Sequence, residues 1–267
     1  MKRGDLTDAQ WARLAPLLPP RAATGRPRRS DRRTLDGIRW ILRTGAPWRD
    51  LPRRYGRWNT VATRFYRWRA AGAWARVLAA LQAEGDAAGD LDWDVHYVDG
   101  TVVRAHQHAA GAAGSNAAAE GLGRSRGGFT SKFHVRAEGG GKPVAVVVTP
   151  GQRHDSMALE PLMERGAVRR AGRGRPRLRP RRVVGDKGHS YRRVRNYLRR
   201  RGIAATIPTR KDQPRARTFD RARYRTRNLV ERLINRFKQY RRIATRYEKR
   251  AVNYLAMLML AAIMMWL

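Results

Sequence analysis

Cysteine is absent from this 267-residue chain, and acidic residues are scarce, with 21 Asp and Glu against 58 Lys and Arg. The absence of cysteine excludes disulfide scaffolds, zinc ribbons, iron–sulfur centres and thiol catalysis. The first residues hold no apolar run of the kind found in secretory signal peptides, so a cytoplasmic protein is expected. Apolar residues still make up 42% of the chain, which is enough for a buried core in one or two domains.

The formal net charge of +37 predicts a polyanionic partner, because a chain so basic repels itself in isolation. Nucleic acid is the expected partner, since every phosphate that a basic side chain neutralises releases condensed counterions. GC-rich coding, which favours arginine over lysine, and an anionic membrane surface are the alternative explanations. The charge is concentrated in residues 165–250, which hold 32 basic and 5 acidic side chains.

Composition divides the chain into three parts. Residues 1–82 show helical spacing of apolar side chains, residues 83–93 form an acidic, glycine-rich linker, and residues 94–267 form a second domain. The first part predicts a small helical bundle with a basic connector at 25–33 and a last helix over 74–81.

Within that bundle, the segment 48–68 resembles a helix-turn-helix. Arg64, Arg67 and Arg69 are then placed to face DNA phosphates, and the tryptophans of the segment, including Trp58, are expected in the core. The alternative is a plain helical bundle whose arginines are merely solvated.

The second domain alternates strand and helix patterns. The patterns predict strands over 95–103, 133–137, 143–149, 182–185 and 204–207, and helices over 155–163, 190–201, 223–247 and 251–267. Three antiparallel strands followed by helix, strand, helix and strand match an RNase H-like α/β domain. The predicted fold class is therefore α/β, with an RNase H-like mixed sheet flanked by helices and preceded by a small all-α, helix-turn-helix-like bundle.

Three acidic residues stand out because acids are otherwise rare. Asp99 and Asp186 each lie at the end of a predicted strand, and Glu231 lies in a helix. Three carboxylates gathered by a sheet and a helix are suited to hold two divalent ions that act in phosphodiester transfer, and hard oxygen ligands favour Mg²⁺, for which Mn²⁺ can substitute. Such carboxylates repel one another, so at least one pKa is expected to rise.

Each acid also has a plainer interpretation. A strand-end Asp is commonly a turn former or a helix cap, and Glu231 has Arg227 four residues before it, which is the spacing of a helical salt bridge. The three acids taken together favour the catalytic interpretation.

A spaced motif carries a family resemblance. Tyr224, Arg227, Glu231 and Lys238 follow the pattern Tyr, two residues, Arg, three residues, Glu, six residues, Lys, within YRTRNLVERLINRFK. The segments YVDGTVVRAH and VVGDKGHS contain the two aspartates. With GRPRR, GAPWRDLP and the terminal NYLAMLMLAAIMMW, the chain resembles bacterial insertion-sequence transposases of the DDE superfamily with a Y-R-E signature, and most of all the insertion-sequence-five family. His189 stands where this pattern has tyrosine.

The resemblance implies a Mg²⁺-dependent DDE transposase that binds the ends of an insertion sequence and catalyses strand cleavage and strand transfer. It implies Asp99, Asp186 and Glu231 as catalytic and metal-binding residues. Its implied partners are double-stranded DNA, at the transposon ends and the target, and a second copy of the chain in a homodimer on DNA. The implied location is the bacterial cytoplasm, in association with the nucleoid.

Other residues are candidates for DNA contact. The resemblance places Tyr224, Arg227 and Lys238 in supporting positions, where Arg227 and Lys238 lie on or near the Glu231 face of a helix. Lys132 and His134 share one side of a predicted strand and are equally candidates for DNA contact or ordinary surface residues.

Three other functions compete with this one. His106 and His108 superficially resemble the paired histidines of rolling-circle nucleases, but Gln107 between them is not hydrophobic. The apolar segment 251–267 has the minimum length of a membrane anchor, although a buried core helix fits it better, and no membrane partner is expected. A catalytically inactive DNA-binding protein derived from a transposase is the remaining alternative.

Overall fold

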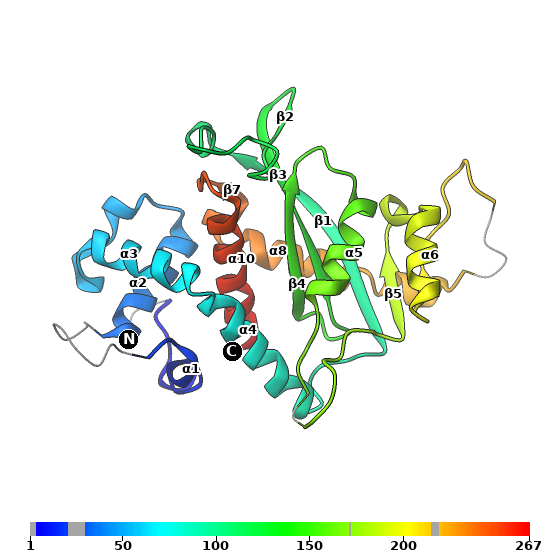
Figure 1. The fold of residues 1–267 in the computed structure, drawn as a ribbon, viewed down its shortest axis with the longest axis horizontal. Helices are drawn as coiled ribbons and strands as arrows, with labels where there is room; N and C mark the ends of the chain where they lie inside the picture. Colours follow the sequence, from blue (N-terminus) through cyan, green and yellow to red (C-terminus); the bar gives the residue numbers. More distant parts are fainter. Residues whose placement is uncertain (1–3, 21–29, 171, 215–218) are drawn as a thin grey trace.

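The computed structural model describes residues 4–20, 30–170, 172–214 and 219–267. Figure 1 shows a helical region formed by the N-terminal part of the chain beside a sheet that carries helices. This mixed α/β architecture confirms the predicted fold class. Residues 25–29 of the predicted basic connector lie outside the described ranges.

The described part of the N-terminal region consists of helices joined by turns. Its elements are α1 (Asp8–Leu14), η1 (Ala15–Leu17), α2 (Asp31–Thr44), η2 (Trp48–Asp50), η3 (Arg53–Tyr55), α3 (Trp58–Ala70) and α4 (Ala73–Ala87). The side chain of Ser30 caps α2 by accepting a hydrogen bond from the Arg33 amide, and Gly45 ends the helix in the left-handed conformation with φ of 71°.

Helix α4 extends six residues beyond the predicted end at residue 81 and includes the first five residues of the predicted linker. One side of its last turns is buried, which explains why the helix continues. Gln82 donates a hydrogen bond to the Val144 carbonyl at 2.8 Å, and Gly85 packs directly on the Trp266 indole. Burial against the sheet therefore outweighs the local glycine-rich composition.

The sheet has the predicted mixed topology. Its strands are β1 (Val95–Ala105), β2 (Gly123–Ser125), β3 (Gly128–Ala137), β4 (Pro143–Pro150), β5 (Arg182–Gly185), β6 (Ala204–Thr206) and β7 (Thr245–Arg246). Strands β1, β3 and β4 are antiparallel neighbours, whereas β5 and β6 continue the sheet from β1 in parallel. This order confirms the RNase H-like arrangement of three antiparallel strands followed by two parallel ones.

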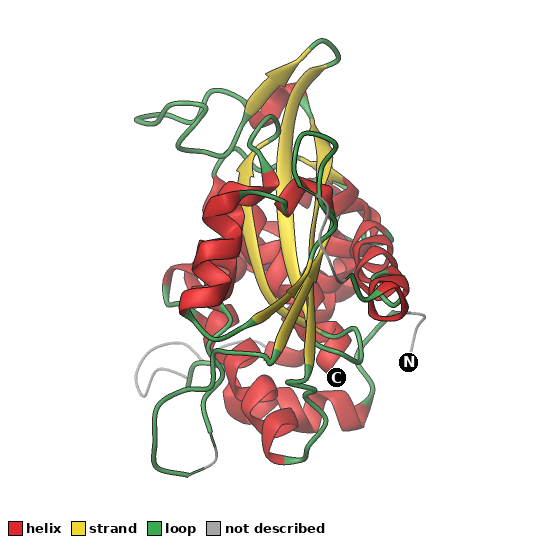
Figure 2. Ribbon diagram, turned by 90° about the vertical axis from the view of Figure 1, so that its right-hand side faces the viewer, coloured by secondary structure: helices red, strands yellow, loops and turns green. Residues whose placement is uncertain are grey.

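Helices cover both faces of the sheet, as Figure 2 shows. They are α5 (Asp155–Arg165), α6 (Arg192–Arg200), α7 (Arg221–Arg225), α8 (Asn228–Lys238), α9 (Arg241–Ala244) and α10 (Ala251–Trp266). Successive residues of β1 separate the faces: Tyr97 belongs to the core shared with α8, α10 and the N-terminal helices, and Val98 to the core under α5 and α6. The same alternation recurs in β5, where Val183 lies under α5 and α6 and Val184 faces the other core.

The single helix predicted over 223–247 is wrong, because the chain forms α7, α8 and α9 there, followed by β7. The first break lies at Thr226, whose hydroxyl donates to the Arg223 carbonyl at 2.7 Å and accepts from the Tyr97 hydroxyl at 2.8 Å. A threonine that bonds locally to the backbone competes with helix continuation. The second break lies at Tyr240, whose backbone is extended, and it returns the chain to β1, which β7 joins in parallel.

Candidate active site and nucleic-acid interface

Asp99 and Asp186 lie side by side where the parallel ladder between β1 and β5 ends. Asp186 directly follows β5, whereas Asp99, predicted at a strand end, lies inside the longer β1, which continues to Ala105. The parallel ladder between β1 and β5 pairs Val98 with Gly185, so the next residue of each strand is a candidate acid. Neighbouring strands are about 4.8 Å apart, which brings two aspartates that are 87 positions apart in the sequence into one electrostatic site.

Asp99 is the more buried of the two, with 15% of its side chain exposed. Its Oδ1 accepts a hydrogen bond from the Gly100 amide at 2.8 Å, and its Oδ2 accepts one from Arg227 Nη1 at 3.0 Å. Burial nevertheless raises the pKa of Asp99 above its ordinary value, and the neighbouring charge of Asp186 raises it further. The predicted rise of one carboxylate pKa is thus present, with desolvation as its largest cause.

Asp186 is more exposed, at 37%, and it has a buried partner. Burial raises the pKa of Asp186, but the hydrogen bond and the charge of His189 outweigh burial, so this pKa lies below its ordinary value. His189 Nδ1 lies 2.8 Å from Asp186 Oδ1. The histidine that departs from the expected tyrosine therefore orients the second candidate acid.

Glu231 joins the two aspartates indirectly. It lies in the first turn of α8 with half of its side chain exposed, and Arg227 Nη2 donates to its Oε1. Because the other guanidinium nitrogen of Arg227 bonds Asp99, this arginine bridges the sheet acid and the helix acid. The break after α7 supplies this bridge, since Arg227 lies at the start of α8 and turns toward the sheet.

The other two signature residues are more peripheral. The ring of Tyr224 lies 5.8 Å from the Arg227 guanidinium carbon and packs against the main core. Lys238 is half-buried at the C-terminal end of α8, about 10 Å along the helix axis from Glu231.

The donor set suits a divalent cation at the strand ends. Asp99 and Asp186 present hard carboxylate oxygens, and the raised pKa of Asp99 shows that its surroundings do not fully compensate the charge of its ionised form. Within the described residues, however, no group of three or more His, Asp and Glu side chains is arranged to hold one ion. The Arg227 guanidinium lies between Asp99 and Glu231. Of the three candidate acids, Asp99 and Asp186 are therefore the pair best placed to bind the same ion.

Lys132 and His134 point to Asp155, an acid that the sequence analysis did not single out. Lys132 Nζ lies 2.6 Å from Asp155 Oδ2, and His134 Nδ1 lies 3.2 Å from Asp155 Oδ1. All three side chains are at least four-fifths buried, which does not favour direct contact of Lys132 or His134 with DNA. The rarity of acids, applied here as it was to Asp99, was the signal that could have singled out Asp155.

Replacement by asparagine is expected to change the stability of the protein in opposite directions at Asp99 and at Asp155, the two aspartates next to Gly100. An acid whose folded-state pKa is raised contributes stability only at low pH and loses it as the pH rises through that pKa, so ionised Asp99 costs stability at pH 7. The pKa of Asp155 is depressed, because Lys132 and His134 outweigh the effect of burial, and its contribution is present at pH 7 and lost in acid.

Asp99→Asn should therefore raise the melting temperature at pH 7 without divalent ions. Asp155→Asn should lower the free energy of unfolding by about 3 kcal/mol, since it leaves the Lys132 ammonium without its buried counter-charge. Differential scanning calorimetry of the two variants checks this, and shifts in the same direction would contradict it.

The predicted arginines of the helical region differ in their surroundings. Arg64 is mostly buried, and its Nη1 donates to Asp31 Oδ1 at 3.1 Å. Arg67 is exposed and lines a shallow hollow of about 240 Å³ with Asn59 and Thr63. Of the two, Arg67 is the one placed to meet a phosphate in this conformation.

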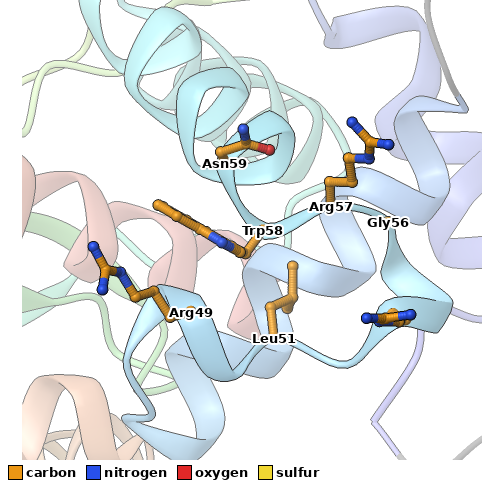
Figure 3. Close-up of a pocket in the computed structure, with 7 residues that line it drawn as sticks. Arg49, Leu51, Gly56, Arg57, Trp58 and Asn59 are labelled. Carbon is orange, nitrogen blue, oxygen red and sulfur yellow. The ribbon is translucent and has the colours of Figure 1, made fainter.

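A larger basic pocket, which the sequence did not indicate, lies at the start of α3 (Figure 3). It measures about 590 Å³, and three exposed arginines line it, namely Arg49, Arg53 and Arg57. Trp58, predicted in the core, is 40% exposed here, with the Arg49 guanidinium 5.7 Å from its ring. Three exposed cations beside an exposed aromatic ring are suited to contact a phosphate backbone.

The competing functions gain no structural support. The rings of His106 and His108 meet edge to face with centroids 4.7 Å apart, but no metal-binding group includes them in the part of the chain that the structure describes. Among the described helices, none combines the length and apolar character of a membrane span. Helix α10 instead packs in the core against α4 and β4, as the buried-helix interpretation of the apolar C-terminal segment predicted.

Comparison with known proteins identifies relatives of both parts of the chain. Residues 94–266 match the family described as Transposase DDE domain, and residues 6–78 match the family described as Putative transposase of IS4/5 family. The uncharacterized protein y4sN of Sinorhizobium fredii is 44% identical over 108 residues, which are 40% of this chain and 82% of that protein.

Two further relatives are named transposases. The putative transposase of insertion element IS402 from Burkholderia cepacia is 34% identical over 45% of this chain and 55% of its own length. The corresponding protein of IS6501 from Brucella ovis is 28% identical over 52% of this chain and 99% of its own length.

A solved Mos1 transposase paired-end complex with the left transposon end covers 81% of this chain and 80% of its own, at 12% identity and a TM-score of 0.26, values too low to argue from. The families and named relatives confirm the predicted function of a DNA transposase and do not favour an inactive derivative. Because the DDE-domain match covers well over half of the chain, the protein belongs to the DDE transposases, and its N-terminal region is similar to the IS4/5 family.

Proposed function

We propose that this transposase binds the two ends of an insertion sequence with residues 1–82 and cuts and rejoins DNA strands with residues 94–267, joined by the segment 83–93. The observation that carries the proposal is the adjacency of Asp99, inside β1, and Asp186, directly after β5, with Glu231 tied to Asp99 through Arg227.

The catalytic acids of the proposal are Asp99, Asp186 and Glu231. A DDE transposase uses divalent metal ions, and we propose that these carboxylates hold two Mg²⁺ ions, for which Mn²⁺ can substitute. When bound, such ions activate the attacking oxygen and stabilise the leaving oxygen of a phosphodiester. Water would attack the phosphodiester at the transposon end, which breaks its bond to the 3′-oxygen and leaves a 3′-hydroxyl and a 5′-phosphate. That hydroxyl would then attack a target phosphodiester, joining to its 5′-phosphate and displacing the target 3′-hydroxyl.

Arg227 and His189 prepare the acids for this role. His189 orients the Asp186 carboxylate through a direct hydrogen bond, and it is itself fully buried. Arg227 compensates the charges of Asp99 and Glu231 in the free protein. Its planar guanidinium suits a bidentate contact with a phosphate, so DNA can take the place of one carboxylate.

The proposed DNA contacts extend over both parts of the chain. Tyr224 and Lys238 flank the acids, and Arg67 and Arg64 lie on α3, although Arg64 must first release Asp31. The pocket of Arg49, Arg53 and Arg57 adds a surface that can grip the backbone. Lys132 and His134 are the least favoured DNA contacts, because Asp155 holds both.

The assembly and location follow from the reaction. Two transposon ends must be joined in one event, so we propose a homodimer on DNA, in the cytoplasm and associated with the nucleoid.

The test is incubation of the purified protein with the DNA that flanks its own gene. Strand breaks should appear at the element ends with Mn²⁺ or Mg²⁺ and be absent with EDTA, as mapped by primer extension. Random nicking, or cleavage that persists in EDTA, would refute the proposal.

A further inference from the structure

A buried polar cluster lies directly behind the proposed active site. Lys132 and His134 of β3 and Asp155, the first residue of α5, lie on the face of the sheet that α5 covers. Asp99 points to the opposite face, since it alternates with Gly100, which pairs with His134 across the ladder. The cluster and the catalytic acid are therefore separated only by the β1 backbone.

Gly100 makes this close approach possible. A Cβ added there would collide with Asp155 Oδ1, and it would lie 2.7 Å from His134 Nδ1 and 3.1 Å from Lys132 Cε. No real Cβ has such neighbours, so the three side chains occupy the space that any other residue would fill.

The same carboxylate also lies next to Gly188, two residues after the second candidate acid. A Cβ added at Gly188 would lie 3.3 Å from Asp155 Oδ2 and 3.0 Å from Asp186 Oδ1. Asp155 thus packs against one glycine next to Asp99 and against another two residues after Asp186. It lies against both of the backbone segments that carry Asp99 and Asp186.

Resting on the proposed catalytic roles of Asp99 and Asp186, we infer that Asp155 is a positioning residue of the active site. It holds the backbone at Gly100 and Gly188, and thereby the two acids, from the opposite face of the sheet. Lys132 and His134 hold Asp155 in turn, and His134 is fixed from its other side by the Thr149 hydroxyl at 2.9 Å.

The arrangement explains why an ion pair occupies this place. The carboxylate reaches the backbone at Gly100 and Gly188, and Lys132 supplies its counter-charge at 2.6 Å, so the charged side chain can occupy this buried space. An apolar side chain of the same size would fill the space but could not be oriented by Lys132 and His134.

Asp155→Asn is the central variant, and Glu248→Gln is its matched control. Glu248 also forms a buried 2.6 Å ion pair, with Arg242, but it contacts none of the acids. Both variants should lose stability. Single-turnover cleavage on pre-bound transposon ends, measured well below both melting temperatures, should fall about tenfold to a hundredfold for Asp155→Asn only.

Two readouts separate positioning from simple loss of stability. Mn²⁺ affinity, measured from the electron paramagnetic resonance signal of free Mn²⁺, should weaken about tenfold in Asp155→Asn and remain unchanged in Glu248→Gln. The dissociation constant for transposon ends should remain unchanged in both. Equal behaviour of the two variants in cleavage and Mn²⁺ affinity would overturn the inference.

Gly100→Ala provides an independent route to the same contact, because its methyl group displaces Asp155 and His134. It should reproduce the loss of cleavage, and the double variant Gly100→Ala/Asp155→Asn should be no slower than the slower single variant. Losses that multiply would show two separate effects and overturn the inference. If wild type itself fails to cleave, or Asp99→Asn cleaves like wild type, the proposed function fails instead.

Discussion

Asp99→Asn is expected to lower the rate of strand cleavage by about a thousandfold or more, since several kcal/mol of transition-state stabilisation depend on the ions that this carboxylate helps to hold. Binding of transposon ends should be retained or slightly tighter, because the substitution removes a negative charge beside the DNA. Single-turnover cleavage of an end-labelled duplex with Mn²⁺, together with a gel-shift titration, measures both.

The stability of Asp99→Asn shows whether lost cleavage results from lost catalysis or from unfolding. Asp99→Asn is expected to fold at least as stably as wild type, because the ionised Asp99 is costly in the absence of metal. Addition of Mg²⁺ should then raise the melting temperature of wild type more than that of the variant. Cleavage by a folded Asp99→Asn protein at the wild-type rate would contradict the assignment of Asp99.

The triple variant Arg49→Gln/Arg53→Gln/Arg57→Gln is expected to bind transposon ends with a markedly weaker salt dependence. Three lost phosphate contacts should reduce the slope of log K against log[salt] by about 2 to 3 and weaken binding at low salt by an order of magnitude or more. Fluorescence anisotropy over a series of salt concentrations checks this. Trp58→Ala should change the slope less than the triple variant, because an uncharged ring releases no counterions.

The control removes the same charge from the other end of the molecule. Arg192, Arg199 and Arg200 are exposed on α6, which lies far from α3 in Figure 1. Their triple glutamine variant should change the slope less on a short duplex that carries only the transposon end. Equal changes in both triple variants would show that net charge alone, and not the pocket at the start of α3, governs end binding.

Much of the fold could be predicted because its signals are local. Alternating apolar residues located β1, β4 and β5 within two residues, and the scarcity of acids drew attention to Asp99 and Asp186. The helix over 223–247 failed because its breaks have distant causes. Thr226 is held by the Tyr97 hydroxyl 129 residues away, and β7 forms only because β1 offers it an edge.

The candidate site shows the same division. The signature spacing related Arg227 to Glu231, since residues four apart share a helix face. It could not reveal that Arg227 also reaches Asp99, or that Lys132 and His134 turn inward to Asp155. Helical periodicity also could not predict that Trp58 is exposed, because Trp58 lies at the start of α3, beside the pocket formed with the preceding turn.

By itself the sequence determined the basic character of the protein, the alternation of strands and helices, and the identity of the scarce acids. These properties depend on residue type and on short-range periodicity, which every stretch of chain carries with it. Only the tertiary structure decided which acids meet, which cation bridges them and which side chains support them from behind. Such contacts join residues far apart in the chain, and they exist only once burial of both faces has set the register of β1 against β3 and β5.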